Sequence, residues 1–332
     1  MSGSPRIVVV GSLNLDLVIH ARVIPSPGQT VLGGAFLQVR GGKGGNQAVA
    51  AARLGAETTM IGRVGDDAFG ESLRAGLVES GVNVDAVRIT SGAASGIAMI
   101  VVDGEGQNAI CVAPGANSVL TPDDVRASRD LIARADVLLV QFETPLETIA
   151  EALRIAREAG VKTIVDPAPA PSGATHLPGG VLRADVVTPN ESEASALTGI
   201  DVCDEASARA AGRALVAHGA QAAAVKLGAR GAVWVTAETE FAAPAFRVDV
   251  VDTTAAGDAF AAGLAMALCR GDDAPSALRY ASAVAAVKCT KSGAQPGLPT
   301  GDEVRGFMAL RPTFDAGNRE RGGNTLSRRG PE

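Results

Sequence analysis

Aromatic residues and positive charge are both scarce in this chain. Phe, Trp and Tyr make up 3% of its 332 residues, and 30 Lys and Arg stand against 36 Asp and Glu, which gives a net charge of −6. A protein that binds nucleic acid needs a basic face and aromatic rings on which bases stack. We therefore expect no nucleic-acid partner. A small anionic ligand remains compatible with this composition, because backbone amides can hold an anion without net positive charge.

Cysteine, histidine and long apolar runs are scarce as well. The chain has 4 cysteines, none in a CxxC pair, and 3 scattered histidines that form no triad or metal-binding pattern. This spacing predicts reduced cysteines rather than a disulfide framework or a zinc site. No apolar stretch approaches the length of a membrane span. We expect a cytoplasmic protein without a membrane partner.

The residues that are present predict an α/β fold. The chain is 46% apolar and 20% charged and holds 40 glycines. Short apolar runs typical of buried parallel strands alternate with helical patterns. This rhythm predicts a doubly wound, mostly parallel sheet with helices on both faces. The predicted strands are 7–10, 58–64, 137–142, 161–166, 185–188, 222–227 and 231–235.

Two regions, about 17–40 and 95–112, depart from that rhythm. Both carry strand-type alternation and turn residues without a helical pattern. We predict that they form a small β-sheet that lies as a lid over the ligand end of the main sheet. The alternative is that they are edge strands of the main sheet. We expect a single domain over 1–312, and a disordered tail over 313–332, which has almost no apolar residues.

The stretch 251–260, VDTTAAGDAF, is the most informative local pattern. An apolar lead-in reaches a turn of small residues, and an Ala/Leu helix pattern follows. The unpaired amides and the dipole at such a helix start favour a bound anion, and Asp258 would lie beside it as a carboxylate base. This arrangement suits phosphoryl transfer to a hydroxyl. The alternative is an ordinary helix start with Thr253 or Thr254 as its N-cap.

A glycine-rich loop, GGKGGNQ at 41–47, precedes an Ala-rich helix. It is not a P-loop, because no Ser or Thr follows the lysine and the glycine spacing differs. We interpret it as a loop whose backbone closes on a polyhydroxyl ligand, with Asn46 as donor and acceptor. The alternative is a glycine-rich loop in which Asn46 is simply an N-cap.

Several motifs in this order resemble those of the ribokinase-like carbohydrate kinases, also called the phosphofructokinase-B family. The resemblance runs from about Arg6 to Leu310. GSLNLD at 11–16 is similar to the family's first-strand sugar motif, and the loop at 41–47 has the form typical of the ribose-specific members. The resemblance further covers TPNE at 188–191, KLGARG at 226–231 and DTTAAGD at 252–258.

The resemblance implies ATP-dependent phosphorylation of D-ribose at its 5-hydroxyl, giving ribose 5-phosphate and ADP. It makes Asp258 the general base and a sugar contact, and it makes the amides of Ala255, Ala256 and Gly257 an anion hole. The other sugar-binding positions it implies are Asn14, Asp16, Gly42, Lys43, Asn46 and Glu143, although Glu143 on its own could simply cap the following helix. The implied ATP-binding positions are Asn190, Lys226, Leu227, Gly228, Ala229, Arg230, Gly231 and Gly257.

The resemblance also implies two kinds of metal ion. Magnesium would accompany ATP and neutralise the β- and γ-phosphates, and Glu193 would contact this ion through water. A potassium-type ion would order the loop before the catalytic helix. Two departures from the family pattern are Ala255, where glycine is common, and Gly297, where serine is common. The positions that match the family's potassium ligands are Asp252, Thr254, Lys288, Lys291, Gly293 and Gly297.

Other functions stay open at this point. The substrate could be 2-deoxyribose, another pentose, fructose or a nucleoside, and a sugar- or nucleotide-sensing protein could share the fold. A dinucleotide-dependent dehydrogenase is excluded because no GxGxxG opens the first helix. Because family members often pair their lid sheets, we expect a homodimer formed through the lid.

Overall fold

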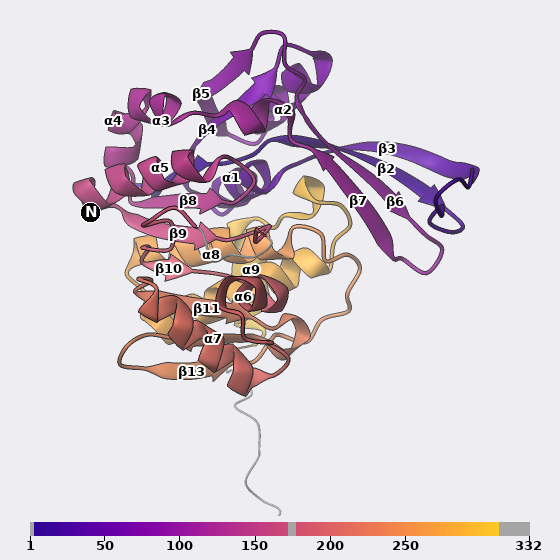
Figure 1. Cartoon of the computed structure of the whole chain (residues 1–332). Helices are drawn as coiled ribbons and strands as arrows, with labels where there is room; N and C mark the ends of the chain where they lie inside the picture. The colour runs from indigo at the N-terminus through magenta and orange to yellow at the C-terminus, as the bar shows by residue number, and fades with distance from the viewer. Residues whose placement is uncertain (1–2, 172–176, 312–332) are drawn as a thin grey trace, which may run out of the picture.

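The computed structural model describes residues 3–171 and 177–311 (Figure 1). The tail predicted to be disordered, 313–332, lies outside the described residues. The main sheet has 9 strands in the order β13-β12-β11-β10-β9-β8-β1-β4-β5. Every neighbouring pair from β10–β11 to β4–β5 is parallel, whereas β12 and β13 run antiparallel at one edge. The predicted doubly wound, mostly parallel fold is therefore confirmed. The strands are β1 (Arg6–Val10), β4 (Glu57–Gly65), β5 (Val82–Thr90), β8 (Val137–Gln141), β9 (Lys162–Asp166), β10 (Val186–Val187), β11 (Ala222–Lys226), β12 (Ala232–Val235) and β13 (Glu240–Ala243).

The central strands are buried on both faces, as their apolar runs predict. Ile7 and Val9 of β1 belong to one core cluster, and Val8 and Val10 belong to another. Because side chains alternate along a strand, these clusters lie on opposite faces of the sheet. On the first face pack α1 (Lys43–Arg53), α2 (Ala68–Glu79), α8 (Ala256–Arg270), α9 (Ala274–Cys289) and α10 (Gly301–Ala309). On the second pack α3 (Pro122–Ala127), α4 (Arg129–Ala133), α5 (Leu146–Ala159), α6 (Glu191–Thr198) and α7 (Glu205–Ala217).

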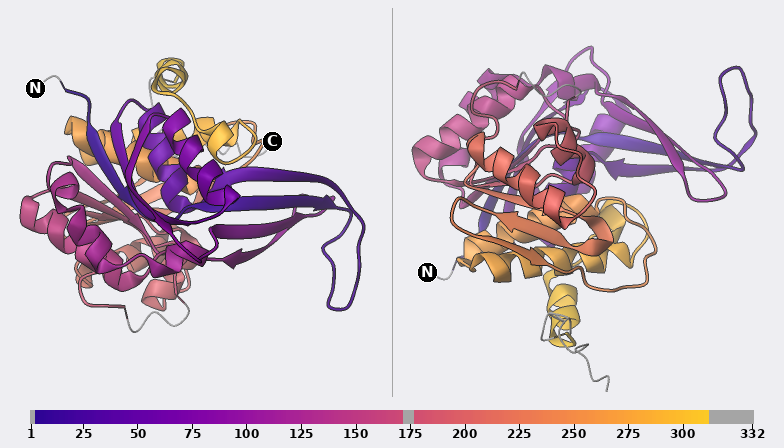
Figure 2. Two further views of the ribbon diagram at one scale, coloured as in Figure 1. Left: turned by 90° about the horizontal axis from the view of Figure 1, so that it is seen from above. Right: turned by 60° about the horizontal axis from the view of Figure 1, so that its bottom comes forward.

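A separate sheet of 4 strands, in the order β3-β2-β6-β7, forms the lid. Its strands are β2 (Asn14–Ala21), β3 (Gly33–Gly41), β6 (Gly96–Val102) and β7 (Asn108–Ala113). It projects from the main body in all three views (Figures 1 and 2). The regions that lack a helical pattern are therefore not edge strands of the main sheet. Asn14 and Asp16, which belong to the motif similar to the family's first-strand sugar motif, lie at the start of β2 and not in β1.

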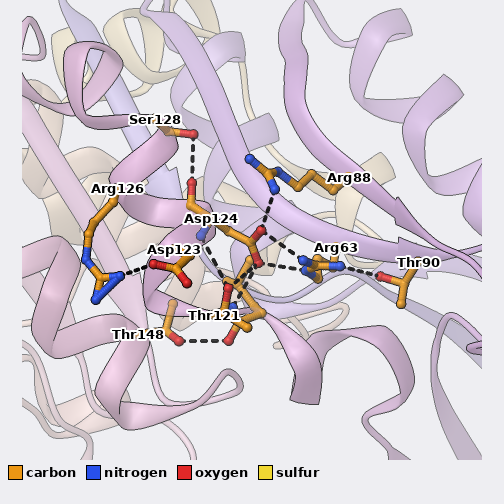
Figure 3. Close-up of polar contacts among 10 residues, drawn as sticks. Arg63, Arg88, Thr90, Thr121, Asp123, Asp124, Arg126, Ser128 and Thr148 are labelled. Atoms are coloured by element: carbon orange, nitrogen blue, oxygen red, sulfur yellow. Dashed lines mark hydrogen bonds and ion pairs between the residues drawn. The ribbon is translucent and has the colours of Figure 1, made fainter.

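An ion cluster around one buried carboxylate joins α3 to the strands β4 and β5 (Figure 3). The Asp124 side chain is 3% exposed and accepts from the Arg63 guanidinium through both oxygens, at 2.7 and 2.8 Å. Arg88 reaches the same carboxylate at 2.8 Å. Asp124 also completes the capping box of α3 with Thr121. One carboxylate therefore holds two strands and the start of a helix.

Candidate active site

The N-terminus of α8 has the geometry that an anion site requires. Its N-cap, Ala255, has φ 61°, the only positive φ of a non-glycine residue within the described ranges. This left-handed residue turns the chain sharply into the helix, whose first-turn amides lack intrahelical acceptors. The amide of Ala256 donates to the carbonyl of Thr253 at 3.1 Å. A phosphoryl oxygen would therefore bind the amides of Ala255 and Gly257 directly. At the Ala256 amide it would compete with the carbonyl of Thr253.

Asp258 lies in the first turn of α8 and is 5% exposed. Its Oδ2 accepts from Nδ2 of Asn46 at 2.9 Å, and its Oδ1 accepts from Nε2 of Gln47 at 3.2 Å. Burial raises the pKa of Asp258 to about 6, a shift that Lys43 opposes and Asp166 reinforces. A carboxylate with this pKa is ionised at neutral pH and more basic than an exposed one, which suits a general base.

Gln47 connects Asp258 to a second buried carboxylate. Its Nε2 also donates to Oδ2 of Asp166 at 3.1 Å, and its Oε1 accepts from Nε2 of Gln141 at 2.6 Å. Gln47 and Gln141 are both fully buried. With both ends of its amide bonded, the Gln47 side chain fixes how the Asp258 carboxylate is oriented.

The glycine-rich loop permits a very close approach of α1 to the turn after β1. Gly42 has φ 82°, and a Cβ there would lie 2.6 Å from the backbone nitrogen of Asn14. A Cβ at Gly44 would lie 2.6 Å from the backbone nitrogen of Ser12. These contacts leave no room for a side chain. The close packing brings the Lys43 amide to Oε2 of Glu143, at 3.1 Å, and the Ser12 hydroxyl donates to the same oxygen.

The predicted sugar-binding residues converge at this place. Asn14 is buried, and its Oδ1 accepts from Nδ2 of Asn117 at 2.8 Å, which leaves its own amide group as a donor. Oδ1 of Asn46 is buried and has no hydrogen-bond partner among the residues that the structure describes. Burial raises the pKa of Asp16 to about 7, with further contributions from Glu143 and Asp258. Donors, acceptors and carboxylates packed this closely match a ligand with several hydroxyls.

Lys43 is the cation of this acidic site. Burial lowers the pKa of Lys43, but the nearby carboxylates of Asp258, Asp166 and Glu143 outweigh that effect and raise its pKa overall. Lys43 also lines the large cavity on the other side of Asp258. It therefore lies where the predicted sugar and nucleotide positions meet.

That cavity, of about 990 Å³, holds most of the predicted nucleotide positions. Its lining includes an ion pair of 2.9 Å between Lys226 and Asp166. Much of the rest of its lining is apolar, a composition that accepts a nucleobase. The predicted positions along its wall are Asn190, Lys226, Gly228, Ala229, Gly231 and Gly257, and the apolar part of the lining includes Phe246, Val248, Val250, Ala285, Ala286 and Cys289.

Two predicted nucleotide residues point elsewhere. The Leu227 side chain is buried in the core between α6, α7 and the strands β11 and β12. Arg230 forms an ion pair with Glu191 and donates to the carbonyl of Cys203 at 2.5 Å. Only the backbone of Leu227 is therefore available to a nucleotide.

Glu193, the residue predicted near magnesium, also lines the cavity. Its carboxylate accepts from the Asn190 amide at 2.8 Å in the capping box of α6. Burial raises the pKa of Glu193, while Lys226 acts in the opposite direction. No group of three or more His, Cys, Asp or Glu side chains that could hold a metal ion occurs in residues 3–171 and 177–311. The residues fit a magnesium ion that arrives with a nucleotide and reaches Glu193 through water, because nucleotide-bound Mg²⁺ keeps several waters.

The residues expected to bind a potassium-type ion do not fit one. The carbonyl oxygens of Asp252 and Lys291 accept hydrogen bonds from Nζ of Lys288, at 3.0 and 3.1 Å. Gly297 offers no side-chain oxygen. Oδ1 and Oδ2 of Asp252 accept from the amides of Thr254 and Gly293, both at 2.8 Å. An ammonium group therefore lies between two of the expected ligands, the carbonyl oxygens of Asp252 and Lys291.

The sequence did not identify several residues of this site: Ser12, Gln47, Asn117, Gln141 and Asp166. Asp166 carried a signal, because it ends a predicted strand at the edge where α/β sheets bind ligands. Gln47 lies next to Asn46 in the glycine-rich loop. Nothing in the local sequence points to Asn117 or Gln141.

Comparison with known proteins agrees with this geometry. The model of the pfkB family carbohydrate kinases matches residues 4–301. The chain is 38% identical over 302 residues to a ribokinase of Haemophilus influenzae, covering 91% of this chain and 98% of that enzyme. It is 40% identical over 302 residues to a bifunctional ribokinase/ribose-5-phosphate isomerase A of Fructilactobacillus sanfranciscensis, covering 90% of this chain but only 55% of that protein.

A solved structure gives the same result. The ribokinase of Arabidopsis thaliana, complexed with ribose and ATP, superposes with a TM-score of 0.84 at 30% identity, covering 92% of this chain and 99% of that one. None of the helices in the described ranges is long and apolar enough to cross a bilayer. With a buried carboxylate at the start of α8, a polyhydroxyl site on one side of it and a large cavity on the other, the chain belongs to the pfkB family of carbohydrate kinases.

Proposed function

We propose that this protein transfers the γ-phosphoryl group of ATP to the 5-hydroxyl of D-ribose, giving D-ribose 5-phosphate and ADP. The observation that carries this proposal is the place of Asp258. It lies between the sugar-binding residues and the cavity, in the first turn of a helix whose amides can hold an anion. The names of the similar enzymes, which are ribokinases, support ribose as the substrate.

In this mechanism Asp258 accepts the proton of the attacking hydroxyl. Its hydrogen bonds to Asn46 and Gln47 hold the carboxylate in one orientation. The amides of Ala255, Ala256 and Gly257 stabilise the negative charge on the phosphoryl group as it moves. Phosphoryl transfer asks the protein mainly for positioning and electrostatic stabilisation, and these groups supply both.

The sugar is held by residues from three segments. Asn14 and Asp16 of β2 and Asn46 of α1 bind the ring hydroxyls, and Glu143 binds a further hydroxyl. Gly42 and Lys43 close the loop over the sugar's other side. A buried carboxylate that loses its hydroxyl partner is left unpaired, so this site discriminates against sugars that lack one.

ATP lies in the cavity, with its triphosphate near Asn190, Lys226 and Gly257. The backbone from Lys226 to Gly231 forms the rest of the nucleotide contact. Magnesium bound with ATP would be held near Glu193 and would neutralise charge on the β- and γ-phosphates. A separate monovalent cation forms no part of this proposal, because Lys288 occupies two of the oxygens expected to bind it.

The test is ADP release from ATP and magnesium with D-ribose, 2-deoxyribose, fructose and adenosine. Turnover largely confined to ribose is the expected result. Turnover on another of these compounds would keep the mechanism and change the substrate. Folded protein that binds ATP but turns over none of them would contradict the proposal and favour a sensing role.

The value of kcat/KM for ribose should fall in two steps as the pH is lowered, because two carboxylates must be ionised. Asp258 must be ionised to accept a proton, and its pKa is raised to about 6 by burial. Asp16 must be ionised to accept hydroxyl protons, and burial raises its pKa to about 7. We expect kcat/KM to fall about tenfold per pH unit below pH 7 and more steeply below pH 6.

Initial rates between pH 5 and 8.5 measure this decrease, and Asp16→Asn provides the control. This variant should bind ribose more weakly and show one titration step instead of two. A wild-type rate that is flat down to pH 5 would contradict the roles of both carboxylates.

We also propose that the protein is a homodimer formed through the lid sheet. That sheet projects from the body (Figure 2), and it carries exposed apolar side chains on its strands. By the strand register, Ile19, Phe36 and Met99 lie on one face of the lid sheet, and Leu37, Ile110 and Val112 lie on the other. Exposed apolar side chains that share a face commonly mark a protein interface, and we assign the dimer contact to the face of Phe36 and Met99.

Light scattering at micromolar concentration should give the mass of a dimer. Phe36→Lys together with Met99→Lys should give the mass of a monomer, because two charges in an apolar interface are costly to bury. A monomeric wild type would contradict the proposed dimer.

The four cysteines are free, which supports our proposal of a reducing, cytoplasmic location.

A further inference from the structure

Lys288 is a lysine in an unusual place. It lies in the last turn of α9, and its side chain is completely buried. A buried ammonium group is costly unless it is paired and hydrogen-bonded. Its partners therefore indicate what it does.

The ammonium of Lys288 joins two loops. Its Nζ donates to the carbonyl of Asp252, before α8, at 3.0 Å, and to the carbonyl of Lys291, after α9, at 3.1 Å. The Asp252 carboxylate attracts it electrostatically and also binds the amides of Thr254 and Gly293. Carbonyl oxygens around a single positive charge form the kind of environment that a monovalent cation occupies.

Gly297 provides the space for this side chain. A Cβ at position 297 would lie 3.1 Å from Cε and 3.2 Å from Cδ of Lys288, and 3.0 Å from the carbonyl oxygen of Ser292. A serine there would press against the lysine. The absence of a side chain at 297 and the presence of a lysine at 288 are thus matched to each other.

Lys288 binds the carbonyl of Asp252, and the Asp252 carboxylate binds the Thr254 amide, so this contact leads directly into the catalytic helix. Asp252 and Thr254 precede Ala255, the left-handed N-cap whose conformation starts α8. Because the fixed charge of Lys288 holds this loop, the turn and the amides that follow it stay in place without a bound cation.

We infer that Lys288 is a built-in monovalent cation, which holds the loop before α8 and makes catalysis independent of potassium. The inference rests on the proposed kinase function for its activity readout. Lys288 acts through the loop and touches neither substrate, so it is a positioning residue.

The first experiment compares ADP release in KCl, NaCl and N-methyl-D-glucamine chloride at constant ionic strength. The wild type should be equally active in all three salts, within about twofold, because no cation binds its loop. Activation by potassium well beyond that over both other cations would overturn the inference.

Variants at position 288 sharpen the test. Lys288→Ala opens the space and should lose about 10- to 100-fold of kcat in N-methyl-D-glucamine chloride, with recovery in KCl. Lys288→Met removes the charge but fills the space, so its loss should not be recovered in KCl. Lys291→Ala is the matched control, because the Lys291 side chain pairs with Glu303 at 2.5 Å while its backbone carbonyl stays in place. It should behave as the wild type does.

A readout without turnover separates this inference from the kinase proposal. The thermal unfolding midpoint of Lys288→Ala should rise by about 2 °C or more in KCl relative to N-methyl-D-glucamine chloride, whereas the wild type should not respond. Lys288→Ala that unfolds at the same temperature in both salts, or that keeps full activity without potassium, would overturn the inference. If Lys288→Ala folds poorly, Lys288→Ala with Gly297→Ser restores a side-chain oxygen and should show the same potassium response.

Discussion

Replacing Asp258 with Asn is expected to lower kcat for ribose phosphorylation by at least about 100-fold, because general base catalysis typically contributes about 10²–10⁴ to the rate. The KM for ribose should change little by comparison, since asparagine keeps the shape and one acceptor oxygen of the carboxylate. The hydrogen bonds from Asn46 and Gln47 orient the side chain, and one of them can persist in the variant.

Steady-state kinetics with varied ribose at saturating ATP measures both constants. Glu143→Gln is the contrasting variant, because Glu143 is bonded to the Lys43 amide and the Ser12 hydroxyl on the sugar side. Its loss should raise KM for ribose more than it lowers kcat. An Asp258→Asn enzyme that retains most of its turnover would remove Asp258 from the role of base.

Features with a local physical cause were predictable from the sequence. The buried strands were found because residues such as Val8 and Val9 form runs that are apolar on both faces. The start of α8 was found because small residues and an acid mark a helix N-terminus. In contrast, β5 was not predicted as a strand. Its burial is mixed, so it lacks a continuous apolar run.

Contacts between distant segments were not predictable from local spacing. Gln47 meets Gln141 and Asp166 across separations of 94 and 119 residues. The family resemblance placed Lys288 near the loop before α8, but as a ligand of a potassium-type ion. A lysine in the last turn of a helix is ordinarily solvent-exposed beside the helix dipole. Its burial depends on Gly297, which lies beyond the helix.

The Asp124 cluster is a second feature that only the fold brings together. Arg63 and Arg88 come from neighbouring parallel strands, where their pairing in the register places two guanidinium groups side by side. Two like charges at adjacent positions repel each other unless an anion lies between them. Asp124, from a helix on the second face, supplies that anion (Figure 3).

Asp124→Ala is therefore expected to lower the free energy of unfolding by about 3–5 kcal/mol, the usual cost of removing one partner from a buried ion pair. The change leaves Arg63, whose side chain is 18% exposed, without a counter-charge. It also removes the capping box of α3. Urea denaturation followed by circular dichroism measures the change.

The adjacent residue provides a matched control. Asp123 is in the same helical turn and pairs with Arg126, but its side chain is 89% exposed. Asp123→Ala should therefore cost at most about 1 kcal/mol, because exposed pairs and dipole contacts contribute little. Neither residue lines the cavity, so the folded fraction of both variants should keep the wild-type kcat. Equal destabilisation by the two substitutions would show that the buried charge of Asp124 does not hold β4, β5 and α3 together.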